Sequence, residues 1–225
     1  ALRRQALGII NIIMLHKIHF SIDQIIDLNI NLFLTDKCET KPLNIKNRIG
    51  IQIVKDFILQ RLRYLLLEKE YRYDIIDAVL AKNLNSIFDI LNRITSIQRI
   101  YHTSNFLRTI TAATRAYNLS KNISNLKIDA NLLQEREEHI LYNQYIKTKE
   151  SIEKLMAKQY YAEIYACLET LNEVIDVFFD EVLVMVDDEN LRNNRLALLK
   201  NIADLYFTVA DLSKIALAKG TIRGD

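Results

Sequence analysis

Basic and amide side chains recur at helical spacing between residues 108 and 122, and they form the strongest chemical pattern in the sequence. Arg108, Thr111, Arg115, Asn118 and Asn122 follow one another at intervals of three, four, three and four. These intervals place side chains on one face of an α-helix. Arginine holds phosphate groups, and asparagine binds base edges or sugar hydroxyls, so this face suits contact with RNA or DNA.

The charge around this face is one-sided. The whole chain has a net charge of only +2. Residues 1–89 carry +3 and residues 129–225 carry −7, whereas residues 90–128 carry +6 and contain no Asp or Glu. A stretch without carboxylates is typical of a surface that faces a polyanion. An acidic protein surface, including the chain's own C-terminal region, is the alternative partner. The six basic residues are Arg93, Arg99, Arg108, Arg115, Lys121 and Lys127.

A second basic pair lies near the start of the last predicted helix. Arg192 and Arg195, with Asn193 between them in sequence, share a helix face because they are three residues apart. Two guanidinium groups so placed can clamp a phosphate. A salt bridge from Arg192 to Asp188 is the alternative. The acidic run 187–189 is interpreted as a cap that complements the helix dipole.

Catalytic and metal-binding constellations are not predicted. His16 and His19 are three residues apart, but no third metal ligand accompanies them. There is no glycine-rich phosphate loop and no recognisable nucleophile elbow. Cys38 and Cys167 lack metal-type spacing and fit a reducing cytoplasm. The apolar run 7–18 is too short to span a membrane, so no membrane partner is expected.

The scarcity of chain-breaking residues predicts an all-α protein. The sequence has four Gly and one Pro, and neither type occurs between Gly50 and Gly220. Strands need frequent tight turns that rely on these residues, whereas long helices joined by short polar loops do not. We expect a bundle of long antiparallel helices behind a short helical N-terminal segment. The predicted helices cover about 2–19, 21–34, 49–69, 73–82, 86–101, 103–123, 130–157, 159–186 and 189–218.

Four segments are predicted from the composition of the chain. Residues 1–34 form a helical segment, and residues 35–48, which hold the only Pro in a polar cluster, form a linker. Residues 49–128 form a helical region that includes the basic stretch. Residues 129–225 form a C-terminal helical bundle.

Residues 178–199 carry a motif that resembles a known family. This motif is similar to the C-terminal signature of the bacterial glycyl-tRNA synthetase beta subunit. The similar parts are, in chain order, Phe178-Phe-Asp, the following Val-Leu-Val-Met-Val, the acidic cap and the helix Leu191-Arg-Asn-Asn-Arg-Leu-Ala-Leu-Leu. Val209-Ala-Asp211 matches the residues that end this family signature. The stretch 1–8 resembles the end of that family's HD-type domain, and Arg61-Leu-Arg with the run 73–79 resembles its following linker.

The resemblance implies the function of the chain and of a larger enzyme. It implies a C-terminal fragment of a beta subunit whose DALR-like domain, residues 129–225, binds the anticodon of tRNA-Gly. The whole enzyme would be a cytoplasmic, AMP-forming class II ligase of two alpha and two beta subunits. Its alpha subunit would charge tRNA-Gly with ATP and Mg, whereas the fragment would hold no cofactor and catalyse nothing. A helical interaction module that touches little RNA is the alternative.

The resemblance also singles out residues in the basic stretch. At 113–118 the family shows Phe-Lys-Arg-Val-x-Asn, where this chain has Ala113-Thr-Arg-Ala-Tyr-Asn118. Arg115 and Asn118 therefore match the family pattern, whereas Thr114 stands where the family has Lys. Glycine anticodons end in two cytosines, so the domain should favour that pair. The expected tRNA-binding residues are Arg108, Arg115, Asn118, Lys121, Asn122, Arg192, Asn193 and Arg195.

Overall fold

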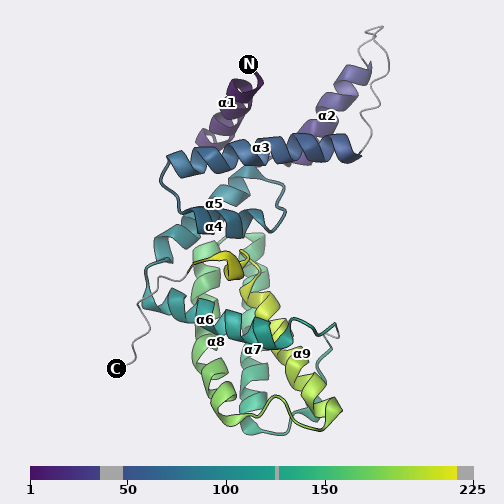
Figure 1. Cartoon of the computed structure of the whole chain (residues 1–225), viewed down its shortest axis with the longest axis vertical. Helices are drawn as coiled ribbons and strands as arrows, with labels where there is room; N and C mark the ends of the chain where they lie inside the picture. Colours follow the sequence, from purple (N-terminus) through teal and green to yellow (C-terminus); the bar gives the residue numbers. More distant parts are fainter. Residues whose placement is uncertain (36–47, 125–126, 217–225) are drawn as a thin grey trace. The chain divides into compact units, whose positions relative to one another are not determined.

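The computed structural model describes residues 1–35, 48–124 and 127–216 (Figure 1). These residues form α-helices and short 3-10 helices, with no strand among them. The predicted all-α class is therefore confirmed. None of the helices in the described residues combines the length and hydropathy needed to cross a membrane. The contacts divide the chain into two compact units, Ala1–Thr95 and Ser96–Asp225.

Unit 1 is built on a long central helix, α3, against which α1, α2 and α4 pack (Figure 1). Ser21 caps α2, because its Oγ accepts a hydrogen bond from the backbone N–H of Gln24 at 3.3 Å. Asn85, 64 residues away in sequence, joins this cap by donating to Ser21 Oγ at 2.9 Å. Its helices are α1 (Leu2–Leu15), α2 (Ile22–Thr35), α3 (Arg48–Glu68), α4 (Tyr73–Leu80) and α5 (Ile87–Ile100), the last of which ends in unit 2.

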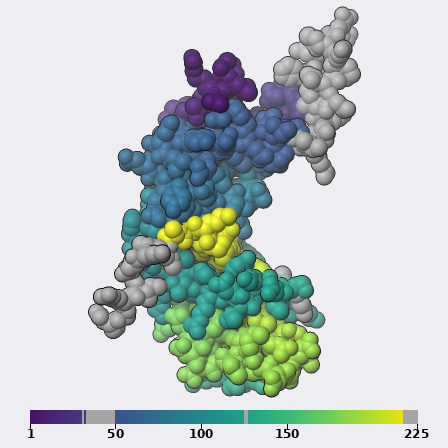
Figure 2. All heavy atoms as spheres, in the orientation of Figure 1, coloured from purple at the N-terminus to yellow at the C-terminus, as the bar shows by residue number. Residues whose placement is uncertain are grey.

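Unit 2 is a bundle in which α7 and α8 lie side by side and α6 crosses α8 and α9 (Figure 1). The space-filling view shows α6, in teal, and the α8–α9 region, in green, as one closely packed surface (Figure 2). Its elements are α6 (Ser104–Ser120), η1 (Ala130–Leu132), α7 (Arg136–Ala157), α8 (Tyr161–Glu181), α9 (Glu189–Tyr206) and η2 (Leu212–Lys214).

A buried chain of hydrogen bonds fixes the crossing of α6, α8 and α9. The Tyr206 hydroxyl of α9 donates to Asn172 Oδ1 of α8 at 2.9 Å, and Asn172 Nδ2 donates to Thr109 Oγ1 of α6 at 2.8 Å. All three side chains are buried. Because buried polar groups are costly without partners, this network favours one packing arrangement of the three helices.

The division between the units differs from the predicted boundary at 128/129. Helix α6 packs its apolar face, with Phe106, Ile110 and Ala113 fully or nearly fully buried, on helices of the C-terminal bundle. Residues 96–128 of the basic stretch and the predicted bundle therefore lie in one unit, whereas residues 90–95 lie in unit 1. The predicted linker, residues 35–48, lies almost entirely outside the described residues.

Three helices are clearly shorter than their periodicity predicts, and one of them is α8, which was expected at 159–186 and spans Tyr161–Glu181. The helix expected at 130–157 begins at Arg136, because the side chain of Asp129 caps a separate 3-10 turn, η1. The helix expected at 189–218 ends at Tyr206, and Asp211 then caps η2 through the backbone N–H of Ser213. In these two cases the apolar pattern extends beyond the helix, because residues in or next to the 3-10 turns, including Leu133 and Leu212, are also buried.

Candidate nucleic-acid interface

The predicted polar stripe occupies the outward face of α6. Arg108, Thr111, Arg115, Asn118 and Asn122 are all exposed, whereas the apolar stripe on the opposite side of the helix faces the core. Thr103 begins the helix by accepting the backbone N–H of Phe106 at 3.2 Å. The helix therefore presents its guanidinium and amide donors to solvent along one side, as its spacing predicts.

Helix α8 supplies the carboxylates that the basic stretch lacks in sequence. Arg108 donates from Nε and Nη2 to Asp176 Oδ2, at 3.1 and 2.8 Å. Asn105 donates to Glu169 Oε2 at 3.2 Å. The Arg108–Asp176 pair is exposed, with 54% and 39% of the two side chains accessible, so water screens it and leaves it weak. A phosphate can compete with Asp176 for this guanidinium.

Arg115 is held in place by an aromatic ring. Its guanidinium carbon lies 4.0 Å from the centroid of the Phe179 ring on α8. Stacking of this kind uses the flat face of the guanidinium and leaves its N–H groups directed outward in the plane. Arg115 makes no ion pair within the described part of the chain. Its donors are thus oriented before any ligand arrives.

Three further predicted residues lie at the C-terminal end of α6. Asn118 is in its last turn, Lys121 is the C-cap residue and Asn122 follows it; all three side chains are exposed. Lys121 is well placed there, because a cation complements the negative end of the helix dipole. Arg93, in contrast, is buried in unit 1 against Asp89 at 3.1 Å and does not belong to this surface.

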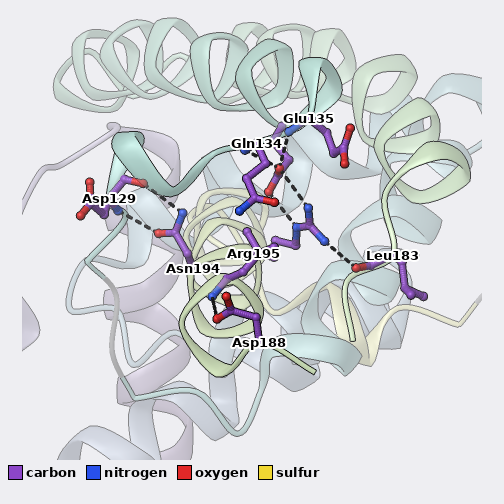
Figure 3. Close-up of polar contacts among 9 residues, drawn as sticks. Asp129, Gln134, Glu135, Leu183, Asp188, Asn194 and Arg195 are labelled. Carbon is purple, nitrogen blue, oxygen red and sulfur yellow. Dashed lines mark hydrogen bonds and ion pairs between the residues drawn. The ribbon is translucent and has the colours of Figure 1, made fainter. Parts of the chain in front are cut away.

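Arg192 and Arg195 face the protein, which differs from the phosphate clamp expected of them. Arg192 donates from Nη1 to the carbonyl oxygen of Val186 at 2.8 Å. Arg195 is 3% exposed and donates from Nη1 to the carbonyl oxygen of Leu183 at 2.8 Å. Both guanidinium groups therefore hold the loop between α8 and α9. Their spacing puts them on one face, but both donate to carbonyl groups of the loop, as Figure 3 shows for Arg195 and Leu183.

The alternative considered for Arg192 is also not what the structure contains. Within the described residues, no ion pair joins Arg192 to Asp188. The Asp188 carboxylate caps α9 by accepting the backbone N–H groups of Asn190 and Leu191, at 2.9 and 3.1 Å. The interpretation of the acidic run as a helix cap is therefore confirmed at Asp188.

A buried ion pair between α7 and α9 anchors the same loop. Arg195 Nε donates to Glu138 Oε1 at 2.8 Å, and Nη2 donates to Oε2 at 3.2 Å. Glu138 Oε2 also accepts the backbone N–H groups of Gln134 and Glu135, at 2.9 and 2.8 Å. The Glu138 side chain is fully buried. One carboxylate thus joins the first turn of α7, helix α9 and, through Arg195, the α8–α9 loop.

Unit 2 should lose stability in acid through this carboxylate. Burial raises the pKa of Glu138, but the bonds from Arg195, Glu135 and Gln134 outweigh it, so the net pKa is below the usual 4.5. A carboxyl group with a lowered folded pKa stabilises the fold above its unfolded pKa. That stability disappears as the pH falls below about 4.5 and through the folded pKa.

Urea unfolding at a series of pH values checks this expectation. Glu138→Gln should show a shallower fall in stability below pH 4.5 than the original chain. The same slope in both proteins would contradict a role for this carboxylate.

Two asparagines next to this pair have different environments. Asn193 is exposed at the start of α9 and stays available to a ligand. Asn194 is buried and binds the backbone of Asp129 in both directions: Nδ2 donates to the carbonyl at 3.0 Å, and Oδ1 accepts the N–H at 2.8 Å (Figure 3). Sequence reasoning missed Asn194, because no local pattern connects residues 65 positions apart.

The chemistry of these residues is that of a binding surface. The exposed face of α6 offers guanidinium, ammonium and amide donors in one row. Phosphates and unpaired bases accept hydrogen bonds from donors of these kinds. Among the residues that the structure describes, no three His, Cys, Asp or Glu side chains are grouped to hold a metal ion.

Two family models match this chain, one within unit 1 and one within unit 2. The family model "Glycyl-tRNA synthetase beta subunit" matches residues 1–81, and the model "DALR anticodon binding domain" matches residues 109–215. The second range begins at the buried Thr109 of α6 and ends after η2, so it covers most of the helices of unit 2.

Curated relatives are similar along nearly the whole chain. Glycine–tRNA ligase beta subunits from Desulforudis audaxviator and Halothermothrix orenii are 34% and 37% identical over 216 and 220 residues. The one from Clostridioides difficile is 32% identical over 215 residues. These matches cover 95–96% of this chain but only 30–31% of each relative. The chain therefore belongs to the glycyl-tRNA synthetase beta subunit family, as the motif at residues 178–199 predicts.

Proposed function

We propose that this chain is the anticodon-binding region of a glycyl-tRNA synthetase beta subunit and that it binds the anticodon arm of tRNA-Gly. The observation that carries the proposal is the exposed row of donors on α6, which contains no carboxylate of its own. This row begins next to the first residue matched by the anticodon binding domain model, and most of it lies inside that match. A row of cations and amides on a helix suits a folded RNA, whose phosphates and unpaired bases lie close together.

We propose separate roles for the predicted residues, which their exposure and contacts support. Arg108, Arg115 and Lys121 bind phosphates, and Asn118 and Asn122 contact bases or riboses, because all five are exposed on or next to α6. Asn193 is a separate candidate, because its side chain is exposed near the start of α9. Arg192 and Arg195 act indirectly by fixing the α8–α9 loop, because both donate to its carbonyl groups.

The chemistry of glycine charging is proposed to reside elsewhere in the enzyme. Relatives of this chain are beta subunits of glycine–tRNA ligases, and the chain spans about 30% of their length. We propose that a class II, AMP-forming alpha subunit supplies the ATP- and Mg-dependent step in a cytoplasmic assembly of two alpha and two beta subunits. This chain then contributes tRNA binding without a catalytic group or cofactor.

One observation favours the alternative of an interaction module. Arg108 already pairs with Asp176, which belongs to the acidic C-terminal region. If every cation of α6 served such internal pairs, the basic stretch would stabilise the bundle and bind little RNA. Arg115 argues against this reading, because it stacks on Phe179 and pairs with no described carboxylate.

Anticodon binding is tested by titrating the chain with native tRNA-Gly and with tRNA-Gly whose two anticodon cytosines are replaced. We expect the replacement to weaken binding by about tenfold or more, since each misread base costs roughly 1–3 kcal/mol. Arg115→Ala should weaken both RNAs by a similar factor, because a phosphate contact carries little sequence information. Equal affinity of the unmodified chain for the two RNAs would show that it does not read the anticodon.

A further inference from the structure

Unit 1 contains an open cleft that is lined mainly by polar side chains. The cleft has a volume of about 600 Å³ and is lined by residues of α1 and α3. These two helices pack together (Figure 1). Two arginines from different helices line it, Arg3 from α1 and Arg61 from α3. Glu68 is the one carboxylate in the lining, so the cleft is net positive. It lies outside residues 109–215 and is independent of the α6 surface.

Arg61 is oriented in this cleft and has an unused donor. Its guanidinium carbon lies 5.0 Å from the centroid of the Phe57 ring and 5.6 Å from that of Tyr64. Its Nε is buried and has no hydrogen-bond partner, and Nη2 makes only a long contact of 3.4 Å with Gln60 Oε1. Because Nε is buried, a ligand in the open cleft would reach the terminal Nη groups of this guanidinium.

The neighbouring groups indicate what kind of ligand would accept hydrogen bonds from Arg61. No ion pair joins Arg3 or Arg61 to a carboxylate within the described residues. The Tyr64 ring lines the same cleft and is 49% exposed. Two guanidinium groups bind a phosphate, and an accessible aromatic ring beside them stacks on a nucleobase. An acidic peptide would satisfy the arginines but would leave the ring without a matching partner.

We propose that the α1–α3 cleft binds a nucleotide of single-stranded or unpaired RNA. Its phosphodiester accepts from the Nη groups of Arg61 and from Arg3, and its base stacks on Tyr64. The chain then holds RNA at two places, the α6 surface of unit 2 and this cleft of unit 1. The second contact has no counterpart in the proposed anticodon site and need not recognise sequence, since its donors reach phosphate and its ring accepts any base.

Titration of the full chain with a tRNA-Gly transcript tests the cleft. Arg3→Gln, Arg61→Gln and Tyr64→Ala should each lower affinity by about five- to tenfold, and each arginine change should reduce the salt dependence by roughly one phosphate contact. Arg4→Gln is the matched control, because Arg4 is exposed on α1 and does not line the cleft. Arg61→Lys should recover only part of the loss, since lysine keeps the charge but not the flat fork.

Each outcome bears on the proposal. Equal effects of Arg3→Gln and Arg4→Gln would mean that only the general charge of α1 matters, and unchanged binding in Arg3→Gln and Tyr64→Ala would exclude RNA from the cleft. Arg3 and Tyr64 are exposed, so these two variants keep the test valid if Arg61→Gln lowers the melting temperature. Failure here with a normal response to Arg115→Ala overturns the cleft alone, and the reverse result overturns only the α6 proposal.

Discussion

Replacing Arg195 with Met is expected to destabilise unit 2 by about 3–5 kcal/mol, the largest stability effect that the structure predicts for one polar side chain. The substitution leaves the carboxylate of Glu138 charged and fully buried without its cation. It also removes the donor to the Leu183 carbonyl oxygen. Hydrogen exchange of the amides in α8 and α9, compared between the two proteins, measures the opening free energy of this unit.

A double variant separates the lost ion pair from other effects of the substitution. Arg195→Met/Glu138→Gln should be more stable than Arg195→Met alone, because a neutral amide no longer needs the cation and its oxygen can still accept the backbone N–H groups of residues 134 and 135. Arg136→Met removes an exposed arginine from the first turn of α7 and should change stability by no more than about 0.5 kcal/mol. Equal losses in the Arg195 and Arg136 variants would refute the buried pair as an anchor.

Reversing two charges on α6 is expected to have the largest effect on RNA binding. The double variant Arg108→Glu/Arg115→Glu should lower tRNA affinity by about one to two orders of magnitude near 0.15 M salt, and its salt dependence should fall by roughly two phosphate contacts. The change removes two exposed cations and places two carboxylates where the RNA backbone would lie. Filter binding at several salt concentrations measures both quantities.

The melting temperature of the same variant distinguishes the two functional readings. The exposed Arg108–Asp176 pair and the Arg115–Phe179 stack contribute at most about 1 kcal/mol each, so an RNA-binding surface predicts a small fall in stability. A large fall with little change in RNA affinity would instead support the interaction module. Lys147→Glu/Lys154→Glu on α7 is the matched control: it changes the net charge equally, at exposed positions away from α6.

Much of the helical architecture follows from local sequence. The absence of Gly and Pro between residues 50 and 220 and the period of the apolar residues predict the helices, and Asp188 caps α9 as expected. The two faces of α6 are also local, because intervals of three and four residues decide which side chains share a side of the helix. The exposed binding row was therefore predictable from Arg108 to Asn122.

Only the tertiary structure decided what the cations contact. Spacing puts Arg192 and Arg195 on one face, but the packing of α9 against α7 and the returning loop turns that face inward. Arg195 and Glu138 are 57 residues apart, and Arg108 and Asp176 are 68 apart, so no local pattern connects either pair. The sequence by itself determined the helices, the family motif and the row of donors on α6. The fold decided which arginines reach solvent and which hold the bundle, because burial and pairing depend on residues brought together from distant helices.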